Sequence, residues 1–188
     1  VININRIGTN ITVGDMVSAL IGSYQSLLIS NKDLILKLMQ LQGKKHQSNA
    51  ISTGSSLNDI ITPTNYYLTT MDFFLLSQIY QLPLVLLCRT KIPTTFSQYI
   101  SFISSDTDHC YIILTGGFSG VNSDTPPLYG LLHRDGSIQL SIANMPAYTT
   151  IISNNISTME EYLSYSLAAM KREKRIRRKP MSIKRGSV

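Results

Sequence analysis

The residues best suited to chemistry stand side by side in the stretch DTDHCYIIL, as His109 and Cys110. A cysteine thiolate activated by an imidazole base is the nucleophile of thiol enzymes, so the two types together suggest a catalytic pair. The apolar run predicts a strand over 109–115, where neighbouring side chains face opposite ways. The two residues therefore cannot form a dyad with each other, although either could pair with a residue elsewhere. The alternative is that His109 lies at a solvent-exposed strand end, helped by two nearby aspartates, and Cys110 packs as a small apolar residue.

Other reactive, metal or cofactor sites find little support in the sequence. Cys88 ends an apolar strand and opens no helix, which favours core packing over a reactive thiolate. His46, His109 and His133 are too scattered to predict a metal site. The glycine-rich stretch 115–120 lacks the Lys and Ser/Thr of a phosphate-binding loop, so we predict no cofactor. Two cysteines are no disulfide framework and indicate reduced thiols in an intracellular setting, although one bridge between them stays open.

The charge is concentrated at the C-terminal end. The chain has 17 Lys and Arg against 11 Asp and Glu, and residues 171–185 hold nine of the basic residues with a single Glu. The remainder therefore holds eight basic and ten acidic residues. A near-neutral body with a strongly basic tail indicates an anionic partner for the tail. The candidate polyanion-binding residues are Lys171, Arg172, Lys174, Arg175, Arg177, Arg178, Lys179, Lys184 and Arg185.

Such a tail can bind nucleic acid through its phosphates, which would be salt-dependent and nearly blind to base sequence. No aromatic residue follows Tyr165, so stacking on single-stranded bases is not indicated. The same segment could dock on an acidic protein surface, act as a nuclear-localisation signal, or only solubilise the chain.

Helices are expected in the N-terminal part of the chain. Residues 1–13 alternate apolar and polar types, as in a short strand or extended arm. Apolar spacing predicts one helix over 14–29 and a second over 32–42, with Asn31 as its N-cap and Gly43 at its end.

The middle of the chain predicts a loop and then a helix–strand unit. Residues 43–58 are small and polar without a period, which is typical of a mobile loop. Thr69 or Thr70 can cap a helix with Asp72 in its first turn, and Pro83 ends it. The next residues, LVLLC, read as a buried strand.

The pattern then becomes that of a mostly antiparallel sheet. Strands are expected over 96–104 and 109–115, and a hairpin over 128–142 around the turn Arg134-Asp135-Gly136. A capping box of Ser157 with Glu160 opens a final basic helix. The fold class is therefore α+β, with one domain over 1–156 and a C-terminal helix with basic tail over 157–188. No apolar run approaches the roughly 20 residues of a membrane span, and no signal peptide is visible.

One segment follows a recognisable pattern, W-G-x-x-x-E-L-x-A-L-A-x-x-Φ-x-x-x-I-x-V, in which Φ is apolar. The residues at its positions are Tyr67 (Trp), Leu68 (Gly), Asp72 (Glu), Phe73, Leu75, Leu76 and Ser77 (the L-x-A-L-A run), Tyr80 (Φ), and Leu84 and Leu86 in the strand. This spacing resembles the ovarian-tumour-type (OTU) cysteine proteases over about residues 60–115. Their catalytic His opens a strand of the form H-Y-x-x-L, which HCYIIL resembles with one residue inserted. The resemblance thus implies His109 as the general base.

The family's nucleophile is absent from the expected place. In OTU proteases it lies in D-G-N-C at the start of an early helix, whereas residues 8–20 here, GTNITVGDMVSAL, contain no cysteine. Degenerate domains of this kind occur in large proteins of large DNA viruses. The resemblance therefore implies a non-catalytic interaction or structural module within a larger, viral assembly, located in the host cytoplasm or nucleus or in the virion. Two alternatives remain: an active OTU-type deubiquitinase whose nucleophile precedes Val1, and a non-specific nucleic-acid-binding protein.

Overall fold

The computed structural model describes residues 2–3, 10–62, 64, 66–88, 99–103, 107–115, 129–143 and 155–178, with no side-chain description of residues 2, 3, 10, 88, 99, 115 and 169–178. The chain forms two compact units, Val1–Ser157 and Thr158–Val188. Helices precede a mixed sheet in the first unit, and a long helix lies in the second. The predicted α+β class is confirmed.

The chain begins with two short paired strands, β1 (Ile2–Asn3) and β2 (Asn10–Ile11), followed by the long helix α1 (Val13–Leu41). A capping box starts α1: Thr12 Oγ1 accepts the Asp15 N–H (3.1 Å), and the Asp15 carboxylate accepts the Thr12 N–H (2.8 Å). The two helices predicted here are one helix with a kink at Asn31, where φ is −149° and ψ is 51°. Gly43 (φ +86°) follows its end as predicted, because glycine adopts left-handed backbone without a Cβ clash.

The prediction of a loop over 43–58 is wrong. This segment contains two helices, α2 (Lys45–Ser52) and α3 (Leu57–Ile60). The Ser48 hydroxyl donates to the Leu36 carbonyl of α1 (3.0 Å), and Ile51 is buried. The sequence shows no period because α2 buries only a serine and an isoleucine. Its tertiary contacts with α1, and not its own propensity, decide the conformation.

The predicted helix–strand unit is present as α4 (Thr70–Tyr80) and β3 (Leu84–Cys88). Thr69 is the N-cap, and the Asp72 carboxylate completes a capping box. Gln81 ends the helix in the left-handed region (φ 50°, ψ 42°), so the chain turns sharply before Pro83.

The described residues form a main sheet of five strands in the order β4–β3–β5–β6, with β7 also paired to β5. Strand β3 pairs antiparallel with β4 (Tyr99–Phe102) and parallel with β5 (His109–Thr115). The parallel β3–β5 pair makes the sheet mixed. Both β6 (Tyr129–Leu131) and β7 (Leu140–Ser141) pair antiparallel with β5.

The predicted hairpin over 128–142 forms only at its tip. Arg134 and Ser137 make an isolated antiparallel bridge around Asp135 (φ 50°) and Gly136 (φ 78°), which is the geometry of a tight hairpin turn. Beyond the tip, β6 and β7 do not continue the pairing with each other and instead pair with different parts of β5. Pairing with the buried strand β5 is therefore favoured over extension of the hairpin that the local turn sequence predicts.

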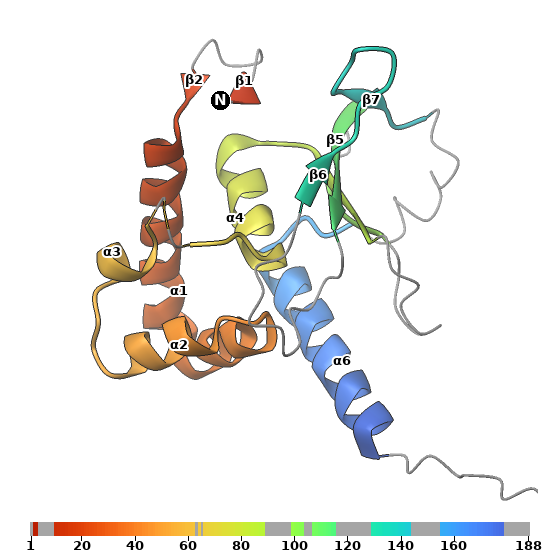
Figure 1. Ribbon diagram of the computed structural model, residues 1–188. Coiled ribbons are helices and arrows are strands. Elements are labelled where there is room, and N and C mark those ends of the chain that lie inside the picture. Colours follow the sequence, from red (N-terminus) through yellow and green to blue (C-terminus); the bar gives the residue numbers. More distant parts are fainter. Residues whose placement is uncertain are drawn as a thin grey trace, which may run out of the picture. The chain divides into compact units, whose positions relative to one another are not determined.

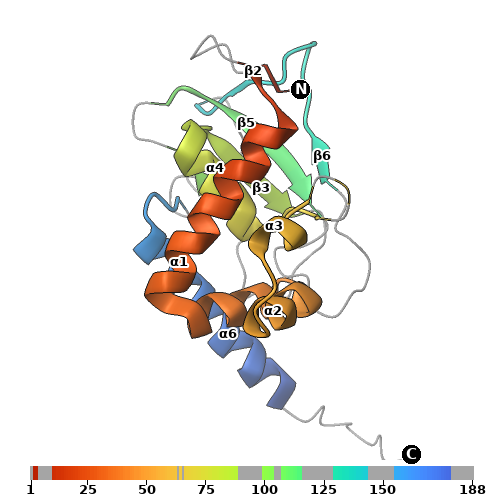
Figure 2. The ribbon, with the colours of Figure 1, turned by 90° about the vertical axis from the view of Figure 1, so that its left-hand side faces the viewer.

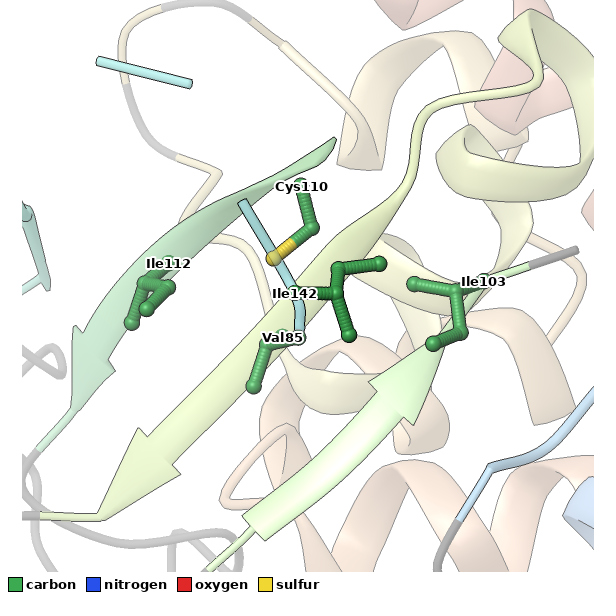
Figure 3. Close-up of a cluster of buried hydrophobic side chains, with 5 residues drawn as sticks. All are labelled: Val85, Ile103, Cys110, Ile112 and Ile142. Atoms are coloured by element: carbon green, nitrogen blue, oxygen red, sulfur yellow. The ribbon is translucent and has the colours of Figure 1, made fainter. Parts of the chain in front are cut away.

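Within the first unit, α4 lies between α1 and the sheet (Figures 1 and 2). The nearly continuous burial of α4 from Thr70 to Ser77 follows from this place, because both of its sides meet other elements. Part of the sheet core is shown in Figure 3, where Val85, Ile103, Cys110, Ile112 and Ile142 pack together from the neighbouring strands.

The second unit contains α6 (Met159–Arg178). Its capping box lies one residue later than predicted and uses Thr158 with Glu161 in place of Ser157 with Glu160. The Thr158 N–H donates to the Glu161 carboxylate (3.1 Å), and the Glu161 N–H donates to the Thr158 hydroxyl (3.2 Å). The sequence STMEE contains the capping-box motif twice, one residue apart. The helix starts at Met159 and therefore uses the second of the two.

Candidate functional site: a buried lysine–aspartate centre and a basic segment

In the described part of the first unit, several polar side chains gather around Asp72. Its position is fixed by the start of α4, since the Thr69 N–H and the Thr69 hydroxyl donate to Asp72 Oδ2 at 2.6 and 2.7 Å. A carboxylate at N3 of a helix stabilises the helix start through these bonds and through the helix dipole. The same carboxylate here also has long-range partners, so it does more than cap α4.

Lys44 reaches Asp72 from the turn between α1 and α2. Its ammonium lies 2.6 Å from Asp72 Oδ2, and both side chains are 0% exposed. The Lys44 backbone N–H donates to the Met39 carbonyl (2.8 Å), which holds this turn directly after Gly43. The salt bridge therefore joins the α1–α2 turn to the first turn of α4.

Two tyrosines complete the partners of Asp72. The Tyr24 hydroxyl of α1 donates to Asp72 Oδ1 at 2.9 Å, and the Tyr66 hydroxyl donates to the same oxygen at 2.7 Å. The Lys44 ammonium also lies 3.5 Å from the centre of the Tyr66 ring, which is a cation–π contact. One carboxylate thus accepts five hydrogen bonds, and no buried side-chain polar atom of the described residues lacks a hydrogen-bond partner.

Burial governs the proton affinities in this centre. Burial lowers the pKa of Lys44, and the Asp72 charge opposes that effect. Burial also raises the pKa of Tyr66 well above its ordinary value, and the negative charge of Asp72 adds to the increase. A buried lysine with a lowered pKa can serve as a nucleophilic amine, but the side chains of Lys44 and Asp72 are both fully enclosed. The arrangement is suited to fixing elements in place and not to meeting a substrate.

The structure separates His109 from Cys110. His109 is exposed at the start of β5, opposite Ser141, whereas Cys110 is 0% exposed within the sheet core (Figure 3). Burial raises the pKa of the Cys110 thiol to about 12, so it stays protonated near neutral pH. The core packing predicted for Cys110 is confirmed, and the prediction for Cys88 concerns a side chain outside the described residues. No group of metal-ligating side chains occurs in the described part of the chain.

The candidate polyanion-binding residues fall in the second unit. The described backbone of α6 includes Lys171, Arg172, Lys174, Arg175, Arg177 and Arg178, while Lys179, Lys184 and Arg185 lie outside the described residues. Lys171, Lys174, Arg175 and Arg178 are spaced three or four residues apart, a spacing that shares one face of a helix.

A cavity of about 380 Å³ lies at the end of α4 beside the end of β4. It is lined by Ser77, Gln78, Gln81, Leu82, Phe102, Ile103, Thr107 and Ser157. Hydroxyls and carboxamides supply its polar lining, and these lining residues include no charged side chain. The cavity could therefore accept a neutral group that offers hydrogen bonds.

Sequence reasoning found Asp72 as a capping residue and missed the other members of its centre. Lys44 lies in the segment 43–58 that is predicted to be a loop, and Tyr24 lies in the helix predicted over 14–29. Forty-eight residues separate Tyr24 from Asp72, and 28 separate Lys44 from it. The sequence shows only that Lys44 directly follows the glycine that ends a helix. That position does not by itself indicate that a lysine side chain is buried.

Comparison with protein-family models, with curated proteins and with solved structures finds no match for this chain. Among the described residues, no helix combines the length and the apolar character required to cross a lipid bilayer.

Proposed function

We propose that this protein is a non-catalytic interaction module with an OTU-like fold that acts within a larger assembly, and that its basic C-terminal segment binds a polyanion. The observation that carries the proposal is the separation of charge between the two units. Val1–Ser157 contains eight basic and eight acidic residues, so its net charge is zero, whereas Thr158–Val188 contains nine basic and three acidic residues, for +6. Almost all attraction for an anion therefore comes from the second unit.

The helical backbone under the basic residues supports nucleic acid as the polyanion. A helix brings Lys171, Lys174, Arg175 and Arg178 onto one face within about two turns, where they can follow successive phosphates. Contacts of this kind carry no base information, so binding would be insensitive to sequence.

The burial of the Cys110 thiol supports the proposal that the module is non-catalytic. Cys110 is buried, and the pKa of its thiol is raised to about 12, which leaves little thiolate for attack. An active OTU-type protease would need a nucleophile from outside this chain, because the matching N-terminal positions hold no cysteine.

The polyanion proposal is tested by measuring the affinity of the full chain for a fluorescent DNA duplex over a range of salt concentrations. We expect log K to fall linearly with log salt, by about 0.9 per phosphate contact, and binding to disappear when residues 171–188 are deleted. A gentler variant replaces Lys171, Lys174, Arg175 and Arg178 with Gln and should reduce both the affinity and the salt slope.

The matched control removes four exposed cations from the first unit: Lys32, Lys37, Lys45 and Arg134, each to Gln. It changes net charge equally and should retain most of the affinity. Equal loss in both variants would show that only net charge matters, and full affinity after deletion of 171–188 would refute the proposal. Binding of an acidic protein but not of DNA would replace nucleic acid with an acidic protein surface as the target.

A further inference from the structure

Among the residues that the structure describes, β4 is the last strand on one side of the sheet, and Asn155 and Ile156, from just before the second unit, lie along its outer edge. Asn155 forms a parallel bridge with Ser101, and the Ile156 N–H donates to the Ser101 carbonyl at 2.9 Å. We call Asn155 and Ile156 the latch. An uncovered edge strand would offer peptide groups to any extended chain, so the latch closes a surface that could pair with another strand.

The Asn155 side chain extends the latch beyond its own backbone. The Ile103 N–H donates to Asn155 Oδ1 at 2.9 Å, and Asn155 Nδ2 donates to the Ile103 carbonyl at 2.8 Å. One carboxamide therefore supplies both bonds that a neighbouring strand would make to Ile103. The Ile103 side chain packs in the sheet core (Figure 3), which anchors the residue whose peptide groups bond Asn155.

The surroundings of the latch suit a longer peptide. Ile156 is 4% exposed, which means that the edge provides an apolar site for one aliphatic side chain. The cavity of about 380 Å³ is lined by Phe102 and Ile103 at the end of β4 and by Ser157, the residue that follows the latch. An extended peptide seated on β4 would thus find space for a neutral side chain next to the same edge.

We propose that the β4 edge is a docking site for an extended, uncharged peptide segment with asparagine followed by an aliphatic residue, and that the latch occupies it in cis. The asparagine would bond both peptide groups of Ile103, the aliphatic side chain would take the place of Ile156, and the backbone would run parallel to β4 by strand addition. This inference rests on the part of the proposed function that assigns protein contacts to the first unit, and it does not involve the basic segment.

The probe is a fluorescent peptide with the sequence of residues 149–158, TTIISNNIST, which carries no charged side chain and has no Coulombic attraction to the basic segment. Its affinity is measured for the native full chain and for Asn155→Ala. We expect the variant to bind at least about tenfold more tightly, because two latch hydrogen bonds that compete with the peptide are gone. The control Asn58→Ala, at an exposed asparagine of α3, should bind as the native chain does.

A second measurement distinguishes docking from unfolding. Hydrogen exchange at the Ile103 amide should accelerate in Asn155→Ala and slow again when the peptide is added, while the Val85 and Leu86 amides of β3 stay protected. If β3 loses protection, Asn155→Asp replaces the variant, because it keeps the shape of the side chain and the Oδ1 acceptor while it replaces the Nδ2 donor with a charged oxygen that the Ile103 carbonyl repels.

The proposal fails if the opened variant binds the peptide no more tightly than the native chain, or if a peptide with alanine in place of the Asn155 equivalent binds equally well. Failure here leaves DNA binding by the second unit unaffected, and loss of DNA binding leaves this result unaffected.

Discussion

At the scale of single residues, the main finding is that Asp72 is shared by a helix cap, a salt bridge and two tyrosines. Removing two charges from water is costly, and a buried pair recovers that cost only when its remaining hydrogen-bonding groups are satisfied. The five bonds to Asp72 meet that condition. The pair therefore contributes mainly by fixing how the α1–α2 turn docks on α4, and breaking it leaves an unpaired buried charge.

We predict that Lys44→Met and Asp72→Asn each lower the free energy of unfolding by about 3–5 kcal/mol, measured by urea denaturation, because each leaves the partner uncompensated in the core. The double variant Lys44→Met/Asp72→Asn should recover much of that loss, since no charge remains buried and the asparagine oxygen can still accept hydrogen bonds inside the centre. Asp59→Asn, at an exposed aspartate of α3, serves as the control and should change little. A double variant as unstable as the sum of the two single variants would contradict this account.

The buried thiol of Cys110 makes the stability of the protein depend on alkaline pH. The unfolded thiol ionises near 9, while the folded thiol, with a pKa of about 12, stays protonated. The native state thus binds more protons than the unfolded state between these values, and stability falls as pH rises through that window. In reducing buffer, the unfolding free energy of the native chain should drop more between about pH 8 and about pH 10.5 than that of Cys110→Ala. Parallel pH profiles for the two proteins would argue against this linkage.

At the scale of elements, α4 is the helix around which the first unit is arranged. It lies between α1 and the sheet (Figure 2). It carries Asp72 in its first turn, and Gln81, its C-cap, lines the cavity. Its end has an unfavourable residue, because a side chain at φ 50° brings Cβ close to the following carbonyl. Glycine is the residue that helix ends of this kind prefer.

We therefore predict that Gln81→Gly stabilises the protein by up to about 1 kcal/mol, measured as a rise in the midpoint of urea unfolding. The matched substitution Gln78→Gly changes an exposed glutamine in the helical part of α4 and should destabilise the protein by about 1 kcal/mol. The two substitutions are thus expected to change the stability in opposite directions. Destabilisation by both would show that the left-handed conformation of Gln81 is not a source of strain.

At the scale of the whole molecule, the two units divide the proposed work. The first has no net charge, encloses its ion pair and contains the β4 edge that the latch covers; the second concentrates the positive charge. The salt dependence of DNA binding and the affinity for the neutral peptide together show whether the basic segment and the β4 edge act separately. Salt should strongly weaken the DNA interaction and hardly affect binding of the uncharged peptide, since screening acts on exposed charges.

The sequence by itself determined the α+β class, the capped helix with the buried strand after it, the break at Asn31 and the distribution of charge. These features follow from local patterns: hydrophobic period, capping residues, and the count of cations in one stretch. It also showed that His109 and Cys110 cannot form a dyad, because adjacent side chains of a strand face opposite ways.

Tertiary structure alone decided the rest. Residues 45–52 are helical because Ser48 and Ile51 find contacts beside α1, and β6 and β7 pair with β5 despite a strong hairpin turn between them. Lys44 and Asp72 meet across 28 residues, and Asn155 reaches Ile103 across 52. Pairings of this range depend on which surfaces the packed elements bring together, and a buried charge or an edge-covering asparagine has no local pattern that distinguishes it from an exposed one.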